Sequence, residues 1–441
     1  MSGTGLHLWA DAKRTFWNGV TRMYNRHNGI TPPSEAELAR RSRAHYLIGE
    51  AGFPNYGDEL IAREWVKYLA QVDPEVPVIF DCLCAGPAAA ILYGLHPKLT
   101  VVDTIAQLCI VDRERLFKAL PDDERASTPI ESIPVTAIGA EMTRALDDEG
   151  YAARYAAGIR LLNERTQDLH IIGGGYMRSF WNANLARLSA AQWAQQHNIP
   201  AVVSGVGLEP LEERDRAYVA AIARDITAFS CRDVPSRDAI DPEHRTTTLA
   251  PDDCFVNALE GVYLPDDAPL PQTMVCMQLD LVSDPKALLE HMVAVLEAWD
   301  VPRGERIGVV ECIPYDSQDA MHMLAEHGWQ PWLYPMQDLL ERGFPAQAGQ
   351  RWLSTRYHPH LLAAARGCSG SFIAVQEGYY DVKHEAVLRM GSRWTQTYIG
   401  QRDIPAPGPG FTDPDVRFMY RNEIRQQVAP LYGAPHSFVS L

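Results

Sequence analysis

From about residue 45 onward the chain alternates between short apolar runs and longer stretches of helical period. The short runs are rich in β-branched residues, whereas the longer stretches repeat their apolar positions every three to four residues. This alternation is typical of βαβ units that build a parallel sheet. The strands expected in a first sheet are Tyr46–Gly49, Val76–Asp81, Leu99–Val102, Leu169–Ile172, Pro200–Ser204, Ile226–Cys231 and Thr247–Leu249.

A loop-rich stretch between Leu249 and Pro271 interrupts the alternation. Proline and aspartate cluster there, which predicts a domain boundary. The alternation then resumes, with helical stretches at Pro285–Trp299 and Ser317–His327, so we expect a second, smaller α/β domain. Its expected strands are Thr273–Gln278, Ile307–Cys312, Trp332–Tyr334, Arg351–Thr355 and Phe372–Gln376.

The end of the chain predicts one more helix. A cluster of helix breakers from Pro405 to Gly410 leads into Asp413–Val428, whose period suits a helix that could cross back to the first domain. In a fold of two α/β domains, ligands bind at the carboxyl ends of the strands and in the cleft between the domains. The predicted segments are an N-terminal extension (1–44), a Rossmann-like domain (45–264), a second Rossmann-like domain (265–400) and a tail (401–441).

Composition narrows the class of partner and the compartment. A formal net charge of -16 disfavours a nucleic-acid partner, although a pair of arginines can still attract a small anion locally. The first thirty residues contain no secretory signal, and the apolar runs are too short to span a bilayer. We therefore expect a cytoplasmic protein that is soluble or, at most, peripheral at a membrane. The eight cysteines show no zinc-ligand spacing, which predicts free buried thiols and no metal.

Two predicted helix starts carry polar residues next to a strand end. Asn55, Gly57 and Asp58 open the helix after the first strand, and Asp58 could be a general base or orient an acceptor hydroxyl. A structural cap explains the same residues equally well. Glu377 and Lys383 follow the last expected strand and are candidate substrate ligands, but a solvated helix start would also account for them.

Two glycine runs also follow predicted strands: Gly173, Gly174 and Gly175, and then Gly205 with Gly207. Glycines let a ligand lie against the backbone, where N–H groups can hold its oxygens, although a tight turn needs glycine too. The second run lacks the G-x-G-x-x-G spacing of a dinucleotide fingerprint, so we reject a nicotinamide site.

Two arginines stand at strand ends in different predicted domains. Arg232 offers a planar fork of donors to a phosphate or carboxylate, and Asp233 beside it is a candidate substrate ligand, unless the two form a surface ion pair. Arg356 and His358 point to the same side if the backbone there is still extended, and Pro359 suits the first position of the next helix. Histidine can exchange a proton near neutral pH, but it could equally satisfy nearby backbone groups.

Taken in order, these motifs resemble the polysaccharide pyruvyl transferase family. The resemblance runs from about residue 45 to 390 and depends on the order of the motifs more than on any one of them. The motifs are Asn-Tyr-Gly-Asp (55–58), Gly-Gly-Gly (173–175), Gly-Val-Gly-x-x-Pro (205–210), Ser-Cys-Arg-Asp (230–233), Pro-Asp (251–252), Arg-Tyr-His (356–358) and Tyr-x-x-Lys (380–383).

The resemblance implies a GT-B-like fold with the active site in the cleft. It also implies phosphoenolpyruvate as the donor substrate, with no other cofactor, a sugar of a polysaccharide, glycolipid or cell-wall glycan as the acceptor, and a pyruvate ketal as the product. By position, Arg232 and Arg356 resemble the donor-binding arginines of the family, and His358 resembles its proposed general acid. Pro359 departs from the small residue that members more often carry.

Two other functions stay open at this point. A GT-B glycosyltransferase that uses a nucleotide sugar would place Glu377 on the ribose and Arg356 on the diphosphate. A non-catalytic glycan-binding protein of the same fold would not need His358 for its function. The acceptor sugar, the ketal linkage and the oligomeric state do not follow from the sequence.

Overall fold

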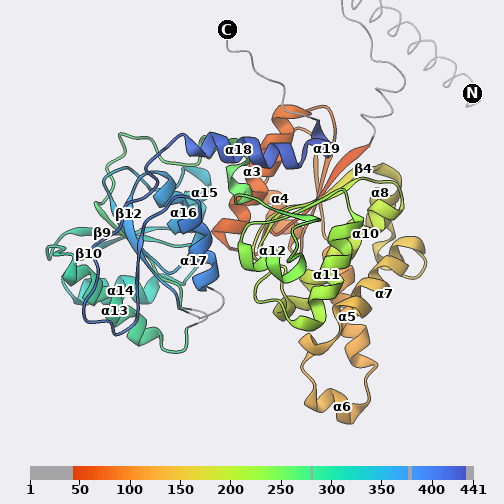
Figure 1. The fold of residues 1–441 in the computed structure, drawn as a ribbon, viewed down its shortest axis with the longest axis horizontal. Helices are drawn as coiled ribbons and strands as arrows, with labels where there is room; N and C mark the ends of the chain where they lie inside the picture. Colours follow the sequence, from red (N-terminus) through yellow and green to blue (C-terminus); the bar gives the residue numbers. More distant parts are fainter. Residues whose placement is uncertain (1–42, 280–281, 376–379, 434–441) are drawn as a thin grey trace, which may run out of the picture. The chain divides into compact units, whose positions relative to one another are not determined.

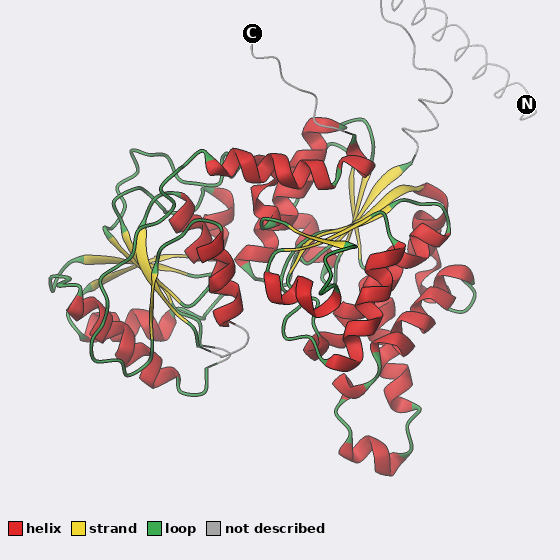
Figure 2. Ribbon diagram, viewed as in Figure 1, coloured by secondary structure: helices red, strands yellow, loops and turns green. Residues whose placement is uncertain are grey.

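The chain folds around two parallel β-sheets that are flanked by helices (Figures 1 and 2). The structure is a computed structural model that describes residues 43–279, 282–375 and 380–433. The first sheet has seven strands, all of them parallel, in the order β3-β2-β1-β4-β5-β6-β7. Their bounds are β1 (Ala44–Ile48), β2 (Val78–Asp81), β3 (Leu99–Val102), β4 (Thr166–Ile171), β5 (Ala201–Val206), β6 (Ala228–Cys231) and β7 (Thr247–Leu249).

The second sheet has six parallel strands in the order β10-β9-β8-β11-β12-β13. As in the first sheet, the strand order reverses once, between β8 and β11 here and between β1 and β4 there. The bounds are β8 (Thr273–Cys276), β9 (Arg306–Val310), β10 (Gln330–Tyr334), β11 (Arg351–Ser354), β12 (Ser369–Ile373) and β13 (Thr395–Thr397).

Helices cover both faces of the first sheet. In β1, Leu47 packs into the apolar cluster that contains α3, whereas Tyr46 and Ile48 pack into a second cluster with α5, α7 and α10. Alternate side chains of a strand point to opposite faces, so a strand covered on both sides is apolar throughout. The helices of this half are α3 (Tyr56–Val72), α4 (Ala85–Ile91), α5 (Thr104–Lys118), α6 (Asp122–Ser127), α7 (Val135–Asp147), α8 (Ala156–Arg165), α9 (Asn182–Ala186), α10 (Leu188–Gln196), α11 (Glu213–Asp225) and α12 (Val234–Ile240).

The second sheet is covered in the same way. Val275 of β8 packs with α13 and α14 on one face, and its neighbour Met274 packs into the cluster that contains α16 on the other. That cluster also holds α3, so it joins the layers of both sheets. The helices of this half are α13 (Pro285–Ala298), α14 (Gln318–Glu326), α15 (Met336–Glu341), α16 (Tyr357–Ala365) and α17 (Tyr380–Arg389).

Direct contacts connect the two halves beside the first turn of α3. The backbone N–H of Tyr56 donates to the carbonyl of Cys312 at 2.9 Å. The ring of Tyr56 stacks on Phe344, with the ring centroids 5.6 Å apart. Because Tyr56 is fully buried, these contacts hold the start of α3 against the second half.

The C-terminal helices, α18 (Val416–Gln427) and α19 (Ala429–Tyr432), return to the first half. Arg425 of α18 donates to the carbonyl of Val256 at 2.9 Å, and its guanidinium lies 4.8 Å from the centre of the Tyr68 ring. The hydroxyl of Tyr432 hydrogen-bonds Nδ1 of His170 at 3.0 Å. The predicted crossing helix is therefore confirmed.

The predicted fold class is confirmed, since two Rossmann-like α/β halves each contribute one doubly wound sheet. Every predicted strand overlaps an observed one, and only β13 was missed, because three residues are too few to show a period. The boundaries placed at residues 264 and 400 stay predictions, and nearly all of the 1–44 extension lies outside the described residues. In the described ranges, no helix combines the length and the apolar character needed to cross a bilayer. Location in the cytoplasm stays a prediction.

Candidate functional site

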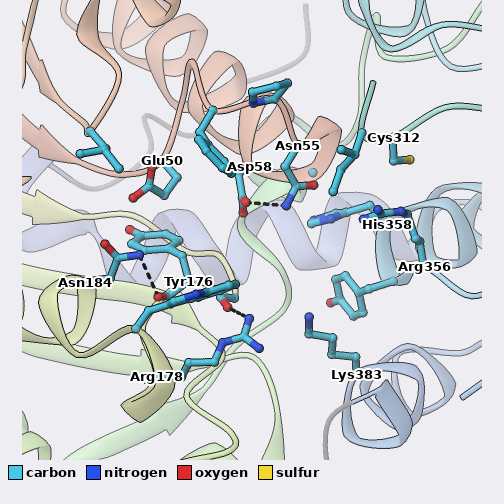
Figure 3. A pocket seen from close by; sticks show the side chains of 18 of the residues that line it. Glu50, Asn55, Asp58, Tyr176, Arg178, Asn184, Cys312, Arg356, His358 and Lys383 are labelled. Atoms are coloured by element: carbon cyan, nitrogen blue, oxygen red, sulfur yellow. Dashed lines mark hydrogen bonds between the residues drawn. The ribbon is translucent and has the colours of Figure 1, made fainter. Parts of the chain in front are cut away.

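A pocket lies where the strand order of each sheet reverses (Figure 3). Ligands of parallel sheets bind outside the carboxyl ends of the strands at such points. The volume of the pocket is about 660 Å³, within the range of small-molecule sites. Residues that follow β1 and β6 line it together with residues that follow β8 and β11. The predicted site residues among them are Asn55, Gly57, Asp58, Gly175, Arg232, Arg356, His358 and Lys383.

Arg232 follows β6 and is buried, so the alternative of a surface ion pair with Asp233 is wrong. Its Nη1 donates to Oδ2 of Asp252 at 2.9 Å, and its guanidinium lies 4.4 Å from the centre of the Tyr357 ring. Asp233 instead accepts the backbone N–H of Ser236 at 2.8 Å and caps α12. The guanidinium is thus held between a carboxylate from the first half and a ring from the second.

Arg356 and His358 both line the pocket, but not for the predicted reason. Arg356 is the extended N-cap of α16, with φ -106° and ψ 144°, and the helix already begins at Tyr357. The backbone is therefore not extended up to His358, and Pro359 is the third helical residue rather than the first. Arg356 donates from Nη2 to Oδ2 of Asp316 at 2.7 Å, which fixes its guanidinium.

The imidazole of His358 lies between Asp252 and the backbone of Gly57. Its Nε2 is 3.6 Å from Oδ1 of Asp252. A Cβ atom at position 57 would lie 2.7 Å from Cγ of the ring, which is closer than real Cβ contacts allow. Burial acts to raise the pKa of Asp252, but the charges of His358 and Arg232 outweigh it and lower that pKa. One buried carboxylate therefore lies beside both Arg232 and His358.

Asp58 faces the pocket instead of capping its helix. It accepts a hydrogen bond from Nδ2 of Asn55 at 2.8 Å, while the Asn55 side chain caps no backbone group. Burial raises the pKa of Asp58, against the opposing charges of His358 and Arg232. Burial also lowers the pKa of Lys383. The carboxyl group is thus a better base than a surface aspartate, and cations surround it.

Sequence reasoning missed several charged residues of the site. Asp252 carried a signal, the Pro-Asp motif, but Asp316 had none, because it lies in a loop with no neighbouring motif. Arg178 also lines the pocket, donates to the carbonyl of Gly175, and lies with its guanidinium 4.2 Å from the centre of the Trp181 ring. Only the fold brings Arg178 to the pocket.

The glycine runs pack against each other behind the pocket wall. The N–H of Gly173 donates to Oδ2 of Asp253 at 2.8 Å, and a Cβ on Gly205 would lie 2.9 Å from Cγ of the same carboxylate. The N–H of Gly207 donates to the carbonyl of Gly174 at 2.9 Å. These four glycines thus approach groups of the protein itself, and a direct role in holding substrate oxygens stays a prediction.

Glycine also makes room for Arg232. A Cβ on Gly175 would lie 2.8 Å from its Nη2, and one on Gly207 would lie 2.9 Å from its Nε. Both distances are shorter than real Cβ contacts. The two runs therefore shape the channel that the arginine side chain occupies.

Three remaining expectations concern Glu377, the cysteines and a metal site. Glu377 lies outside the described residues. All eight cysteines are free thiols and all but Cys84 are buried, which confirms that expectation. In the part of the chain that the structure describes, no three His, Cys, Asp or Glu side chains gather as metal ligands would.

The chain is similar to known proteins in sequence and in fold. A family model described as polysaccharide pyruvyl transferase matches residues 55–306, more than half of the chain. No curated protein matches the sequence. Similar solved structures include MurG of Acinetobacter baumannii (12% identity, TM-score 0.44, covering 89% of this chain and 96% of that chain). Another is a putative UDP-N-acetylglucosamine 2-epimerase of Listeria monocytogenes (10% identity, TM-score 0.45, covering 79% of this chain and 82% of that chain).

Proposed function

The chain belongs to the polysaccharide pyruvyl transferase family, and on that premise we propose that it moves the pyruvyl group of phosphoenolpyruvate onto two hydroxyls of a sugar. The product is a pyruvate ketal on a polysaccharide, glycolipid or cell-wall glycan, and phosphate is released. One observation carries the proposal: Arg232 from the first half and Arg356 from the second line the same pocket as His358.

The two arginines suit a donor with two anionic groups. Phosphoenolpyruvate carries a carboxylate and a phosphate on the same carbon, so it needs two cations a short distance apart. Asp252 orients Arg232 and Asp316 orients Arg356, so neither guanidinium has to reorganise when the donor binds. Both arginines are buried, and charge-assisted hydrogen bonds are stronger there than in water. Local charge thus offsets the net charge of -16.

The reaction needs one proton to be added to carbon and two to leave the sugar. His358 gives a proton to the methylene carbon, which becomes the methyl group and leaves an oxocarbenium-like centre at the neighbouring carbon. A sugar hydroxyl attacks that centre as Asp58 takes its proton. A second hydroxyl then displaces phosphate from the same carbon, and its proton leaves with the phosphate. Asp252 holds a negative charge 3.6 Å from Nε2 of the His358 ring.

The raised pKa of Asp58 has a consequence for the dependence on pH. As a base, Asp58 must be ionised, and a carboxyl with a raised pKa becomes protonated at a higher pH than a surface aspartate does. Turnover should therefore fall on acidification earlier than an ordinary aspartate predicts, and Asp58→Asn should lower kcat by about 100-fold or more. An unchanged kcat in Asp58→Asn would exclude it as the base.

Donor binding gives the first test. Phosphoenolpyruvate at 100 times its Kd should stabilise the wild-type protein by about 2.7 kcal/mol, seen as a rise in Tm. Arg232→Gln and Arg356→Gln should each abolish that rise, and Arg356→Lys should restore only part of it, because lysine lacks the planar fork. Stabilisation by a nucleotide sugar but not by phosphoenolpyruvate would support a glycosyltransferase instead.

Phosphate release gives the second test. The protein is incubated with phosphoenolpyruvate and a panel of acceptor glycans, and free phosphate is measured. We expect release that depends on the acceptor and is lost in His358→Ala, while the Tm of that variant stays close to that of the wild type. Binding of glycans without release from any acceptor would contradict the transferase and favour a glycan-binding protein.

A further inference from the structure

The pocket continues beyond the residues proposed for the donor. Figure 3 shows Glu50, Asn184 and Tyr176 on the opposite side of the pocket from Arg356 and His358. The first half of the chain also gives the pocket apolar side chains. They follow β1 and β2, lie on α5, or lie at the start of α9 and just before it. The apolar members are Phe53, Pro54, Leu83, Ile110, Trp181 and Ala183.

Trp181 gives this side of the pocket an aromatic wall. It ends the short helix η3 (Ser179–Trp181) and is 38% exposed. The guanidinium of Arg178 near its ring restricts how the indole can turn. An exposed, oriented indole offers a flat apolar surface with a polar edge, and such a surface suits the apolar face of a sugar ring.

Arg113 gives the same side a cation that no carboxylate neutralises. It projects from α5 into the pocket, and its Nη1 donates to Oδ1 of Asn182 at 3.2 Å. Asn182 is fully buried and is anchored in turn through Nδ2 to the carbonyl of Ile133 at 2.9 Å. Within the described ranges, Nε of Arg113 is buried without a hydrogen-bond partner, and the guanidinium forms no ion pair.

Arg113 differs from the two donor arginines in the partner that holds its guanidinium. Arg232 and Arg356 each have an aspartate partner, whereas the guanidinium of Arg113 is positioned only by a neutral amide. A positioned arginine that lacks an anion inside a pocket is suited to bind one from a ligand. Since Arg356 and His358 lie on the other side of the pocket (Figure 3), that anion belongs to a second ligand.

We propose that the acceptor binds with its sugar ring against Trp181 and with an anionic group, a phosphate or a carboxylate, on Arg113. This inference rests on the proposed function and narrows the acceptor to a sugar phosphate or a uronic acid, as opposed to a neutral glycan. The sugar hydroxyls then face Asp58, which lies in the same pocket, while the anionic substituent stays apart from the donor arginines.

A binding experiment tests the site without turnover. Three hexoses of gluco, galacto and manno configuration are each titrated into the protein as the methyl glycoside, the 1-phosphate and the uronic acid, with phosphoenolpyruvate present. At least one charged form should bind about tenfold more tightly than its neutral parent, an arginine–anion contact worth about 1.4 kcal/mol. The stronger of the two charged forms identifies phosphate or carboxylate as the natural group.

Matched variants assign that preference to the pocket. Arg113→Gln should remove the tenfold preference and leave the affinity for phosphoenolpyruvate unchanged, whereas Arg113→Lys should keep part of it. Arg115→Gln, on the same helix but outside the pocket, should change neither. Trp181→Ala should weaken the charged and neutral forms by a similar factor, because it removes the surface that all of them share.

The outcomes separate the two proposals. If the wild-type protein binds phosphoenolpyruvate but no sugar of the series, or binds charged and neutral forms equally, the acceptor inference is overturned and the proposed function stands. A preference that survives in Arg113→Gln also overturns it. If the sugars show the expected preference but phosphoenolpyruvate does not bind, the anionic sugar site is supported and the donor assignment fails.

Discussion

The contact between Gly57 and His358 allows a prediction that separates folding from chemistry. Gly57 is the second residue of α3 and needs no unusual backbone angle, so alanine suits its local conformation. Substitution of alanine would place a methyl group 2.7 Å from Cγ of the His358 ring and nearer still to other ring atoms. Normal contacts are about 3.5–4.0 Å. The ring therefore has to move by at least about 1 Å.

Two opposing effects set the stability of Gly57→Ala. Alanine in place of glycine favours a helix by about 0.5–1 kcal/mol, whereas overpacking costs about 1–3 kcal/mol. The free energy of unfolding should therefore fall by no more than about 2.5 kcal/mol, and the variant should fold. The catalytic effect is larger, because a misplacement of 1 Å can cost about 100-fold. We expect kcat/KM to fall at least about 100-fold, or about 2.7 kcal/mol.

The assay compares phosphate release with urea denaturation. Gly86→Ala is the matched control, because Gly86 also lies in a helix and a Cβ there would meet no atom within 4 Å. Gly86→Ala should keep full activity. If Gly57→Ala acts through the imidazole, its loss should vanish in a His358→Asn background. Full activity of Gly57→Ala, or losses that add in the double variant, would refute the assignment of the His358 position.

Two further predictions concern buried charges. Asp252→Asn leaves the guanidinium of Arg232 without its anionic partner, so the free energy of unfolding should fall by about 3–5 kcal/mol in urea denaturation, and a loss under about 1 kcal/mol would contradict the buried pair. Burial disfavours the charge of His45, but a hydrogen bond to Asp168 and the nearby carboxylate of Asp73 raise its pKa from 6.5 to about 9. The charged His45 stabilises the fold fully below pH 6.5, and this stabilisation is lost as the pH rises through 9. The loss is at most about 3 kcal/mol. It is an upper limit because burial also raises the pKa of the partner, Asp168, which opposes the stabilisation. Urea midpoints should fall across that window in the wild type and not in His45→Gln, and a flat wild-type profile would contradict the prediction.

The sequence by itself determined the strands and the edge of the sheets where the chemistry lies. Apolar runs such as Val78–Asp81 are buried on both faces, so their pattern does not depend on distant partners. Glycine and polar residues follow several of these strands, and parallel strands bring their carboxyl ends to one edge. The two arginines follow strands of different sheets, and the resemblance to the pyruvyl transferase family is what placed Arg232 and Arg356 in one site; both line the pocket.

Only the tertiary structure decided which groups pair inside the pocket. Asp252 lies beside both Arg232 and His358. His358 follows Asp252 by 106 residues in the chain, and no local pattern encodes a contact over that distance. Arg113 sits on a helix whose sequence looks like an ordinary solvated face, and its lack of an anionic partner depends on how α5 packs against Asn182. Electrostatic pairing depends on distances and burial, and the fold sets both through contacts between residues far apart in sequence.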